Sequence, residues 1–385
     1  MYKKSLAAMA VLGAFAGSSF AADVTFYGKL DAGLSYENAE TTYLNGSKDT
    51  VEGLTLDSGV QEASRFGIKG VEDLGNGYKV GFVLENGFSG DDGALKESNK
   101  LFDRQAHLDL YTPYGTFVAG RTGGISTASG PLDLVFARGD AFDGGHNNVL
   151  GFAQAPKADN VLGYMSPSIY GFQLGAAYSF QNKTGVGHEG HRDTDHYVGL
   201  GLSYDIGALQ TAVSFEQNQR GTGATLVDTK IITFGGNYDF DAFKLFALGQ
   251  YFEGADAMGD YLFTKGHPTS EFNNMNKNGV EGFALHVGTT FAALGGDWEA
   301  GIYLGDYTAN GLHTVTQAPK DVDGEYFGVA ARYAYQLSNR TKVMASAGYD
   351  QLTWDKWYTA NDQWKQKEDF EKTRYFGRVS LVHNF

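Results

Sequence analysis

The chain has 385 residues with 53 glycines, 23 tyrosines and 27 phenylalanines but only 6 prolines, and its formal net charge is −15. It contains no cysteine, which excludes a disulfide framework and zinc sites built from thiolates. Aromatic residues make up 14% of the chain, yet its mean hydropathy is −0.30. A polar chain that is rich in Tyr, Phe and Gly indicates strands with one apolar and one polar face.

The first 21 residues have the pattern of a secretory signal peptide. Two lysines precede an apolar run over residues 6–16, and the small residues Ser19 and Ala21 stand just before a cleavage point. The run is too short to span a bilayer, and no later stretch approaches the ~20 apolar residues that a spanning helix needs. We therefore expect residues 1–21 to be removed and residues 22–385 to form one domain. A secreted soluble β-protein and a membrane protein that crosses with strands both remain open at this point.

Short turn signals and long polar stretches alternate along the rest of the chain. The short turns are expected near residues 72–78, 112–115, 169–171, 205–208, 239–243, 293–297 and 337–341. The long stretches lie near residues 38–59, 89–100, 122–159, 182–194, 219–228, 254–279, 309–322 and 356–371. Seven turns and eight loops connect sixteen strands, and this even number puts both chain ends on the same side.

Apolar and polar residues alternate along the strand segments. In the first segment Val24, Phe26 and Leu30 share one face, whereas Lys29 and Asp31 lie on the other. So many apolar faces need a second sheet or lipid to cover them, and the loops hold too few apolar residues for a sandwich. Because every backbone group in lipid must be hydrogen-bonded, only a closed sheet can face it. The sequence therefore predicts an all-β transmembrane antiparallel barrel of sixteen strands, with short periplasmic turns and long extracellular loops.

The last segment, RYFGRVSLVHNF, ends the chain on a bare aromatic residue. Chain ends are usually polar and frayed. Pairing of this strand with the first one would close the barrel and place Phe385 inside the structure. The residues expected on its lipid face include Val379, Leu381, His383 and Phe385.

Five stretches together resemble the Gram-negative general diffusion porins, closest to the betaproteobacterial branch. They are this ending, the opening strand VTFYGKLDAGL, and the segments SRFGIKG, DRQAHLDL and TFVAGR. The resemblance covers essentially the whole mature chain. It implies an outer-membrane homotrimer of sixteen-stranded barrels in lipid and lipopolysaccharide, each with a water-filled pore for small hydrophilic solutes and ions. It further implies no cofactor and no nucleic-acid partner, and a terminal strand read by the outer-membrane assembly machinery through Tyr375, Val379, Leu381, His383 and Phe385.

The longest loop, residues 122–159, is too apolar to be freely solvated. It carries Leu132, Leu134, Val135, Phe136 and Phe142. Folding the loop into the lumen would bury these residues, and the resemblance implies that this third loop is the pore constriction. The acids that it could bring to the pore are Asp133, Asp140 and Asp143, of which we favour the last two.

The resemblance also implies a ladder of basic residues opposite the loop, namely Lys29, Arg65 and Arg121. Alternation independently puts Lys29 and Arg65 on the non-lipid face, whereas the assignment of Arg121 to this face depends on the resemblance alone. A fourth arginine of some family members would align with Met165, so the ladder is weaker here.

Strand parity adds further lumen positions on neighbouring strands, and these complete what we call the basic wall. The added residues are Lys69, Arg332, Lys342, Arg374 and Arg378, against the acids Asp31 and Asp350. We hypothesise a basic wall that faces an acidic loop, although ordinary solvated lumen charges are the alternative. Removal of the leader takes the formal net charge from −15 to −17, but charges on outer loops are screened beyond ~8 Å. The expected preference is therefore weakly for anions.

Two other features of the sequence, a group of histidines and the lack of catalytic motifs, bear on a metal site and on enzymatic activity. His188, His191 and His196 have a spacing that could hold a divalent metal, but we favour the simpler interpretation of a polar surface loop. The sequence has no G-x-S-x-G motif and no Ser–His pair at a recognisable spacing, so no enzymatic activity is expected. A substrate-specific outer-membrane channel and a surface adhesin or receptor barrel remain as alternatives to the diffusion channel.

Overall fold

The structure is a computed structural model that describes most of the predicted mature chain. The described ranges are 23–43, 46–127, 130–142, 152–153, 157–182, 188–221, 227–255, 279–314, 317–355 and 369–385, without the side chains of residues 310–320. The predicted leader and Asp143 lie outside these ranges. Within them, no helix has both the length and the apolar character needed to cross a membrane.

One antiparallel sheet contains all the strands, and the described residues add one short helix. The elements in chain order are β1 (Asp23–Thr42), β2 (Lys48–Ser58), β3 (Arg65–Gly75), β4 (Tyr78–Gly87), β5 (Gln105–Thr112), β6 (Gly115–Thr122), α2 (Phe136–Gly139), β7 (Ala158–Met165), β8 (Phe172–Ser179), β9 (His196–Ile206), β10 (Leu209–Gln219), β11 (Thr229–Asp239), β12 (Lys244–Ala255), β13 (Val280–Ala293), β14 (Gly296–Thr314), β15 (Gln317–Ser338), β16 (Thr341–Trp354) and β17 (Phe370–Asn384).

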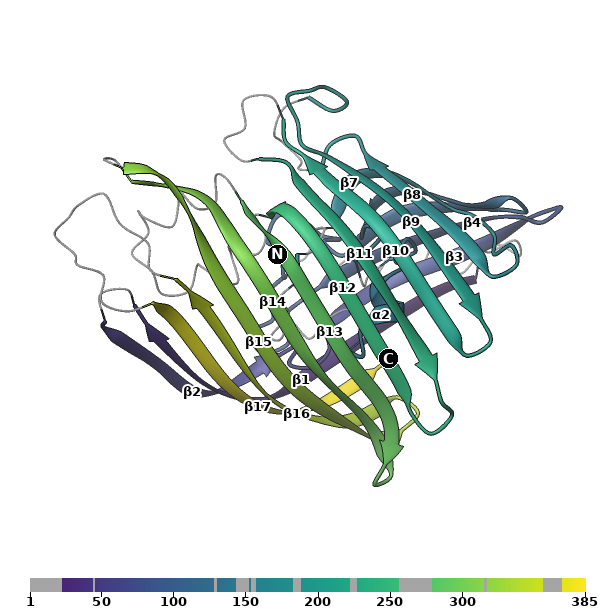
Figure 1. The fold of residues 1–385 in the computed structure, drawn as a ribbon. Coiled ribbons are helices and arrows are strands. Elements are labelled where there is room, and N and C mark those ends of the chain that lie inside the picture. The colour runs from purple at the N-terminus through teal and green to yellow at the C-terminus, as the bar shows by residue number, and fades with distance from the viewer. Residues whose placement is uncertain are drawn as a thin grey trace, which may run out of the picture.

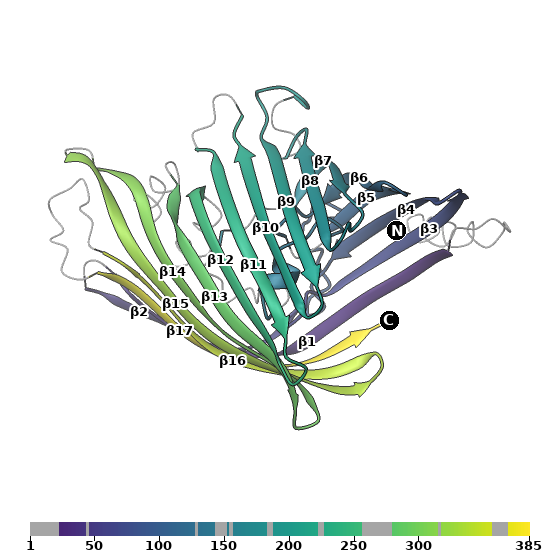
Figure 2. The same cartoon turned by 45° about the vertical axis from the view of Figure 1, so that its right-hand side comes forward.

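The sheet closes on itself because β1 pairs with β17 from Lys29↔Asn384 to Thr42↔Glu371. On its other edge β1 pairs with β3 at its beginning and with β2 farther along. The strands β2 and β3 therefore occupy one place in the ring, so the 17 assigned strands form a barrel of 16. This confirms the predicted fold. Figures 1 and 2 show the tilted strands curving around a space in which α2 lies.

All seven short turns lie where the sequence predicts them, between β3 and β4 and then between each later pair on that side. Two predicted loops are wrong. Most of 38–59 belongs to the β1–β2 hairpin, and most of 309–322 belongs to the β14–β15 hairpin. These stretches are polar because water, not lipid, contacts them. Polar composition alone predicts a loop here, but a hydrogen-bonded strand ladder forms without an apolar face.

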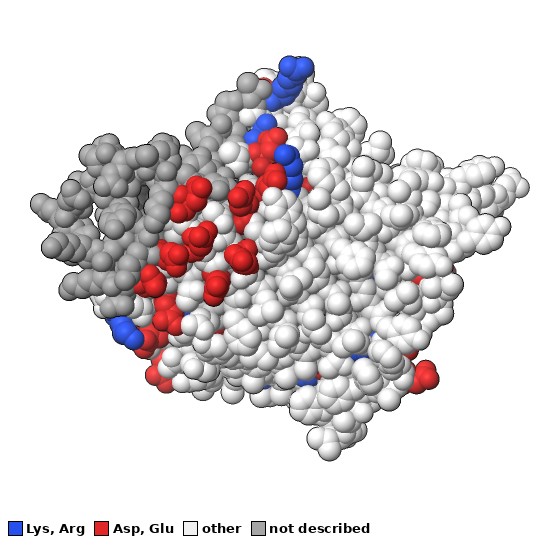
Figure 3. All heavy atoms as spheres, in the orientation of Figure 1, with Lys and Arg blue, Asp and Glu red and all other residues white. Residues whose placement is uncertain are grey.

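The outer face is apolar over most of its height. Phe26, Phe234 and Leu285 point outward and expose 55%, 60% and 54% of their surface, as expected for a face that lipid covers. Figure 3 shows this as a broad uncharged area, with acidic side chains gathered in a band toward the loop ends of the strands. We define the rim carboxylates as Asp306, Asp323, Glu325, Asp355, Asp369 and Glu371, which line one hollow.

The seam between the first and last strands is tightly packed. Gly28 and Phe385 exchange two backbone hydrogen bonds of 3.0 Å each, and the Phe385 ring lies 5.9 Å from that of Phe26. A methyl group on Gly28 would overlap the Phe385 ring and lie 2.9 Å from the carbonyl oxygen of Arg65. The aromatic end therefore fills a position that only a glycine opposite it leaves open.

We expect Gly28→Ala to lower the free energy of unfolding by about 1–3 kcal/mol, because it overpacks the seam. Gly377→Ala is the matched control, since it lies on the other seam strand and an added methyl there meets nothing within 4 Å. The control should change the free energy by no more than about 0.5 kcal/mol. Urea unfolding in detergent micelles measures both, and equal midpoints for the two variants would contradict the prediction.

Candidate channel constriction

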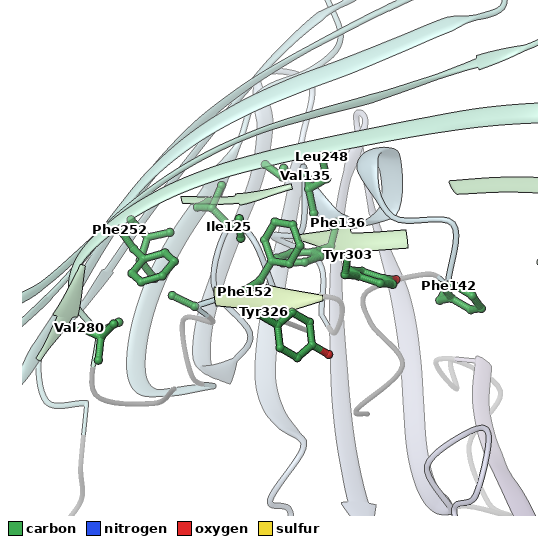
Figure 4. Close-up of a cluster of buried hydrophobic side chains, with 14 of the residues drawn as sticks. Ile125, Val135, Phe136, Phe142, Phe152, Leu248, Phe252, Val280, Tyr303 and Tyr326 are labelled. Carbon is green, nitrogen blue, oxygen red and sulfur yellow. The ribbon is translucent and has the colours of Figure 1, made fainter. Parts of the chain in front are cut away.

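The third long loop lies inside the barrel, against inward-facing glycines of the strands. A methyl group on Gly163 would meet Leu132 at 2.6 Å, and one on Gly175 would meet Leu134 at 2.9 Å. Because these wall positions lack side chains, the loop packs directly on the strand backbone. Leu132, Leu134, Val135, Phe136 and Phe142 are all at least 97% buried, and Figure 4 shows several of them packed together with side chains of the strands. This confirms the expectation that the loop folds inward.

Asp133 caps the short helix α2. Its carboxylate accepts backbone N–H bonds from Val135, Phe136 and Ala137 at 3.1, 3.2 and 3.3 Å. The side chain is half-buried. Burial outweighs these hydrogen bonds and raises the pKa of Asp133 to about 6. The carboxyl group therefore changes its charge close to neutral pH.

Asp140 does not face the pore, so that expectation was wrong. It is 2% exposed, and it accepts hydrogen bonds from the Tyr303 hydroxyl at 2.9 Å and the Phe142 N–H at 3.0 Å. His286 lies beside it, with 3.4 Å between Nε2 and the carboxylate. Burial raises the pKa of Asp140. The residue anchors the loop to β13 and β14, because buried polar groups need partners.

The same histidine holds the loop backbone. The Ala141 N–H donates to His286 Nε2 at 3.2 Å, so Nε2 acts as an acceptor. The other nitrogen, Nδ1, lies 3.0 Å from the Ile302 carbonyl oxygen and must donate to it. These two contacts together fit the neutral ring.

A second buried anchor holds the beginning of the loop. Glu216 on β10 accepts hydrogen bonds from the hydroxyl groups of Ser126 and Tyr197, and the Ser126 N–H donates to it at 3.2 Å. The Ile125 N–H donates to the Tyr197 hydroxyl at 2.9 Å. Sequence analysis missed this anchor, although alternation around Glu216 already places its side chain inward.

On the wall formed by β3 to β7, two arginines share one carboxylate. Glu85 on β4 lies 2.7 Å from Arg104 and 3.7 Å from Arg65. Arg121 pairs with Asp159 at 2.5 Å and donates to the Asp103 carbonyl at 2.7 Å. The structure thus brings Arg65 and Arg121 to one region. Arg104 was missed as a site residue, even though it stands in the segment DRQAHLDL.

On the wall formed by β14 to β17, Arg332 and Arg374 have acidic partners, and two of these, Glu299 and Glu37, were not expected from the sequence. Arg332 pairs with Glu299, which stands opposite it in the strand register. Arg374 bonds Asp350 at 2.8 Å and lies 3.8 Å from Glu37. Asp31 and Asp350, the two acids expected from the sequence, are therefore not the only acids beside these bases.

The remaining members of the basic wall have mixed surroundings. Arg378 donates to the Ser35 hydroxyl at 3.1 Å and lies 4.4 Å from the centre of the Phe376 ring. Lys69 lies 5.1 Å from the centre of the Tyr27 ring. Lys29 and Lys342 both pair with one acid, Glu62.

The three histidines considered for a metal do not converge. His188 Nδ1 lies 2.7 Å from Asp193, whereas His196 Nε2 lies 2.9 Å from the carbonyl oxygen of His191. No group of three or more His, Cys, Asp or Glu side chains is arranged to hold a metal in the part of the chain that the structure describes.

Comparison with known proteins gives consistent results. A family model described as Gram-negative porin matches residues 7–353. An outer membrane porin protein of Bordetella pertussis is 30% identical over 380 residues, which cover 90% of this chain and 94% of that protein. Outer membrane porin protein 32 of Delftia acidovorans is 33% identical over 255 residues, covering 64% of this chain and 69% of that protein.

Solved structures with the same fold include an anion-selective porin from Comamonas acidovorans. It is 23% identical with a TM-score of 0.62, and the match covers 94% of this chain and 100% of that one. A trimer form of an outer membrane protein of Vibrio cholerae is 16% identical with a TM-score of 0.53, covering 93% and 98%. Since a family model matches residues 7–353 and the Bordetella porin is matched over 94% of its length, the chain belongs to the Gram-negative porins, the diffusion channels of the outer membrane.

Proposed function

We propose that this porin is a general diffusion channel for small hydrophilic solutes and ions with a weak preference for anions. The observation that carries the preference is the sharing of Glu85 by Arg65 and Arg104, because two guanidinium charges meet one carboxylate there. The burial of Asp140 adds to it, since this loop acid is withdrawn from the water of the pore. Charges that line a narrow aqueous throat act on every passing ion.

The proposal includes a homotrimer embedded in lipid and lipopolysaccharide. The trimer form of the Vibrio cholerae barrel supports it through the shared fold. It also includes recognition of the terminal strand by the assembly machinery. Tyr375 and Leu381 support that role because they point outward and expose 58% and 50% of their surface. Catalysis is not part of the proposed function.

Planar-bilayer recording tests the proposal. The purified protein should give stepwise single-channel conductance, and its reversal potential in a KCl gradient should have the sign of anion preference. A surface adhesin would give no conductance, and a clear cation preference would contradict the proposed selectivity.

Arg65→Gln should lower the ratio of anion to cation permeability by about threefold, since it removes one unit charge within several ångströms of the ion path. Lys230→Gln is the control. It removes a cation whose side chain is 51% exposed and whose ammonium lies 3.5 Å from Glu253 near the loop end of the outer face, where salt screens it. The reversal potential of each variant gives the permeability ratio. An identical shift in both variants would contradict the idea that charges in the throat set the ion selectivity.

Lowering the pH from 7.5 to 5 should raise the ratio of anion to cation permeability by about twofold. The pKa of Asp133 is raised to about 6, so its carboxyl group is charged above that pH and neutral below it. The negative charge of Glu216 adds to the rise in the pKa of Asp133. Asp133→Asn keeps an oxygen that can cap α2 but should flatten the response. A variant that responds to pH as the wild type does would rule out Asp133 as the titrating group.

A further inference from the structure

The second strand of the barrel is interrupted, and residues 59–64 form what we call the inserted segment. It connects β2 and β3, which pair with successive parts of β1. The interruption begins at Gly59, whose φ of 69° is readily adopted only by glycine. The Gly59 N–H still donates to the Asp31 carbonyl at 2.8 Å. Beyond it the chain leaves the ladder on the side of the inward-facing Asp31.

Asp31 fixes the path of this segment. Its carboxylate accepts the backbone N–H groups of Gln61 and Glu62 at 2.7 and 2.6 Å, and its own N–H donates to the Ser64 hydroxyl at 3.1 Å. Asp31 is fully buried. Because both N–H groups point back to Asp31, the side chains of the segment are directed along the inner wall.

The segment reaches across the seam of the barrel. Gln61 donates from its side-chain amide to the Ser346 hydroxyl on β16 at 2.8 Å, beyond β17. The Glu62 carboxylate lies between two ammonium groups, one from Lys29 on β1 and one from Lys342 on β16, the latter at 2.5 Å. The side chains of Glu62 and Lys342 keep 19% and 23% of their surface exposed. The cluster thus borders the water of the lumen.

We infer that Glu62 is a specificity-determining residue of the channel, a tethered carboxylate that occupies an anion site between Lys29 and Lys342 and thereby limits the anion preference. This inference rests on the proposed function. A strand that ran on without interruption would leave both ammonium groups facing the lumen without this carboxylate. The neighbouring charges are Asp31, which holds the segment, Arg332 on the adjoining β15, and Glu299 and Asp297 on β14.

The alternative is that Glu62 only fastens the segment to the wall. The two roles differ in what a compensating charge does. A fastening role depends on the individual ion pairs, so removal of a second partner would add to the damage. A selectivity role depends on the local net charge, so removal of one acid and one base restores it.

The experiment measures reversal potentials in a KCl gradient for three variants. Glu62→Gln keeps the size and hydrogen-bonding capacity of the side chain but raises the local charge by one, so the ratio of anion to cation permeability should rise about threefold. Lys342→Gln should lower the ratio by a similar factor. The double variant should return to within about 1.5-fold of the wild type, since the two unit changes cancel.

Glu253→Gln is the matched control, because Glu253 also contacts a lysine, Lys230, but lies on the outer face. It should leave the ratio unchanged. If Glu62→Gln conducts normally with the wild-type ratio, or if the double variant retains the ratio of Glu62→Gln, the inference is overturned. Should Glu62→Gln fail to fold, Lys342→Gln alone decides, since an unchanged ratio would place the cluster away from the ion path. Absence of conductance in the wild type would instead overturn the proposed function.

Discussion

Every other feature of this protein depends on the demand of lipid that each backbone N–H and C=O find a partner within the protein. The β1–β17 seam meets that demand and turns an open sheet into a ring. Once the ring is closed, alternation gives each strand a lipid face and a lumen face. The lumen is the only place where the protein can hold charge at membrane depth, so filtering and anchoring must share the same inner wall.

These two tasks use acids in different ways. Asp140 and Glu216 are buried and hydrogen-bonded to tyrosine hydroxyls, so they hold the inward loop and take no direct part in the field of the pore. Glu85 and Glu62 each lie between two cations. Inward glycines contribute to this division, because they let the loop lie directly on the backbone of the strands.

The barrel could be predicted from the sequence because its signals are local. Alternating faces and glycine-rich turns need only a few neighbouring residues, and each was found where expected. The partners of charged residues could not be predicted in this way. Lys342 and Glu62 are 280 positions apart in the sequence. They meet only because the barrel closes at its seam and because the second strand is interrupted at Glu62. From the sequence alone Asp140 is expected to be a solvated loop acid, because its burial against Tyr303 depends on how the loop folds.

The rim carboxylates make the outside of the barrel sensitive to salt near its loop ends. Asp306, Asp323 and Glu325 line one hollow on β14 and β15. In seawater-like ionic strength their field fades within a few ångströms, but at about 0.01 M it extends roughly 30 Å. These like charges therefore repel one another more strongly in fresh water than in brine, and dissolved salt stabilises this edge of the sheet.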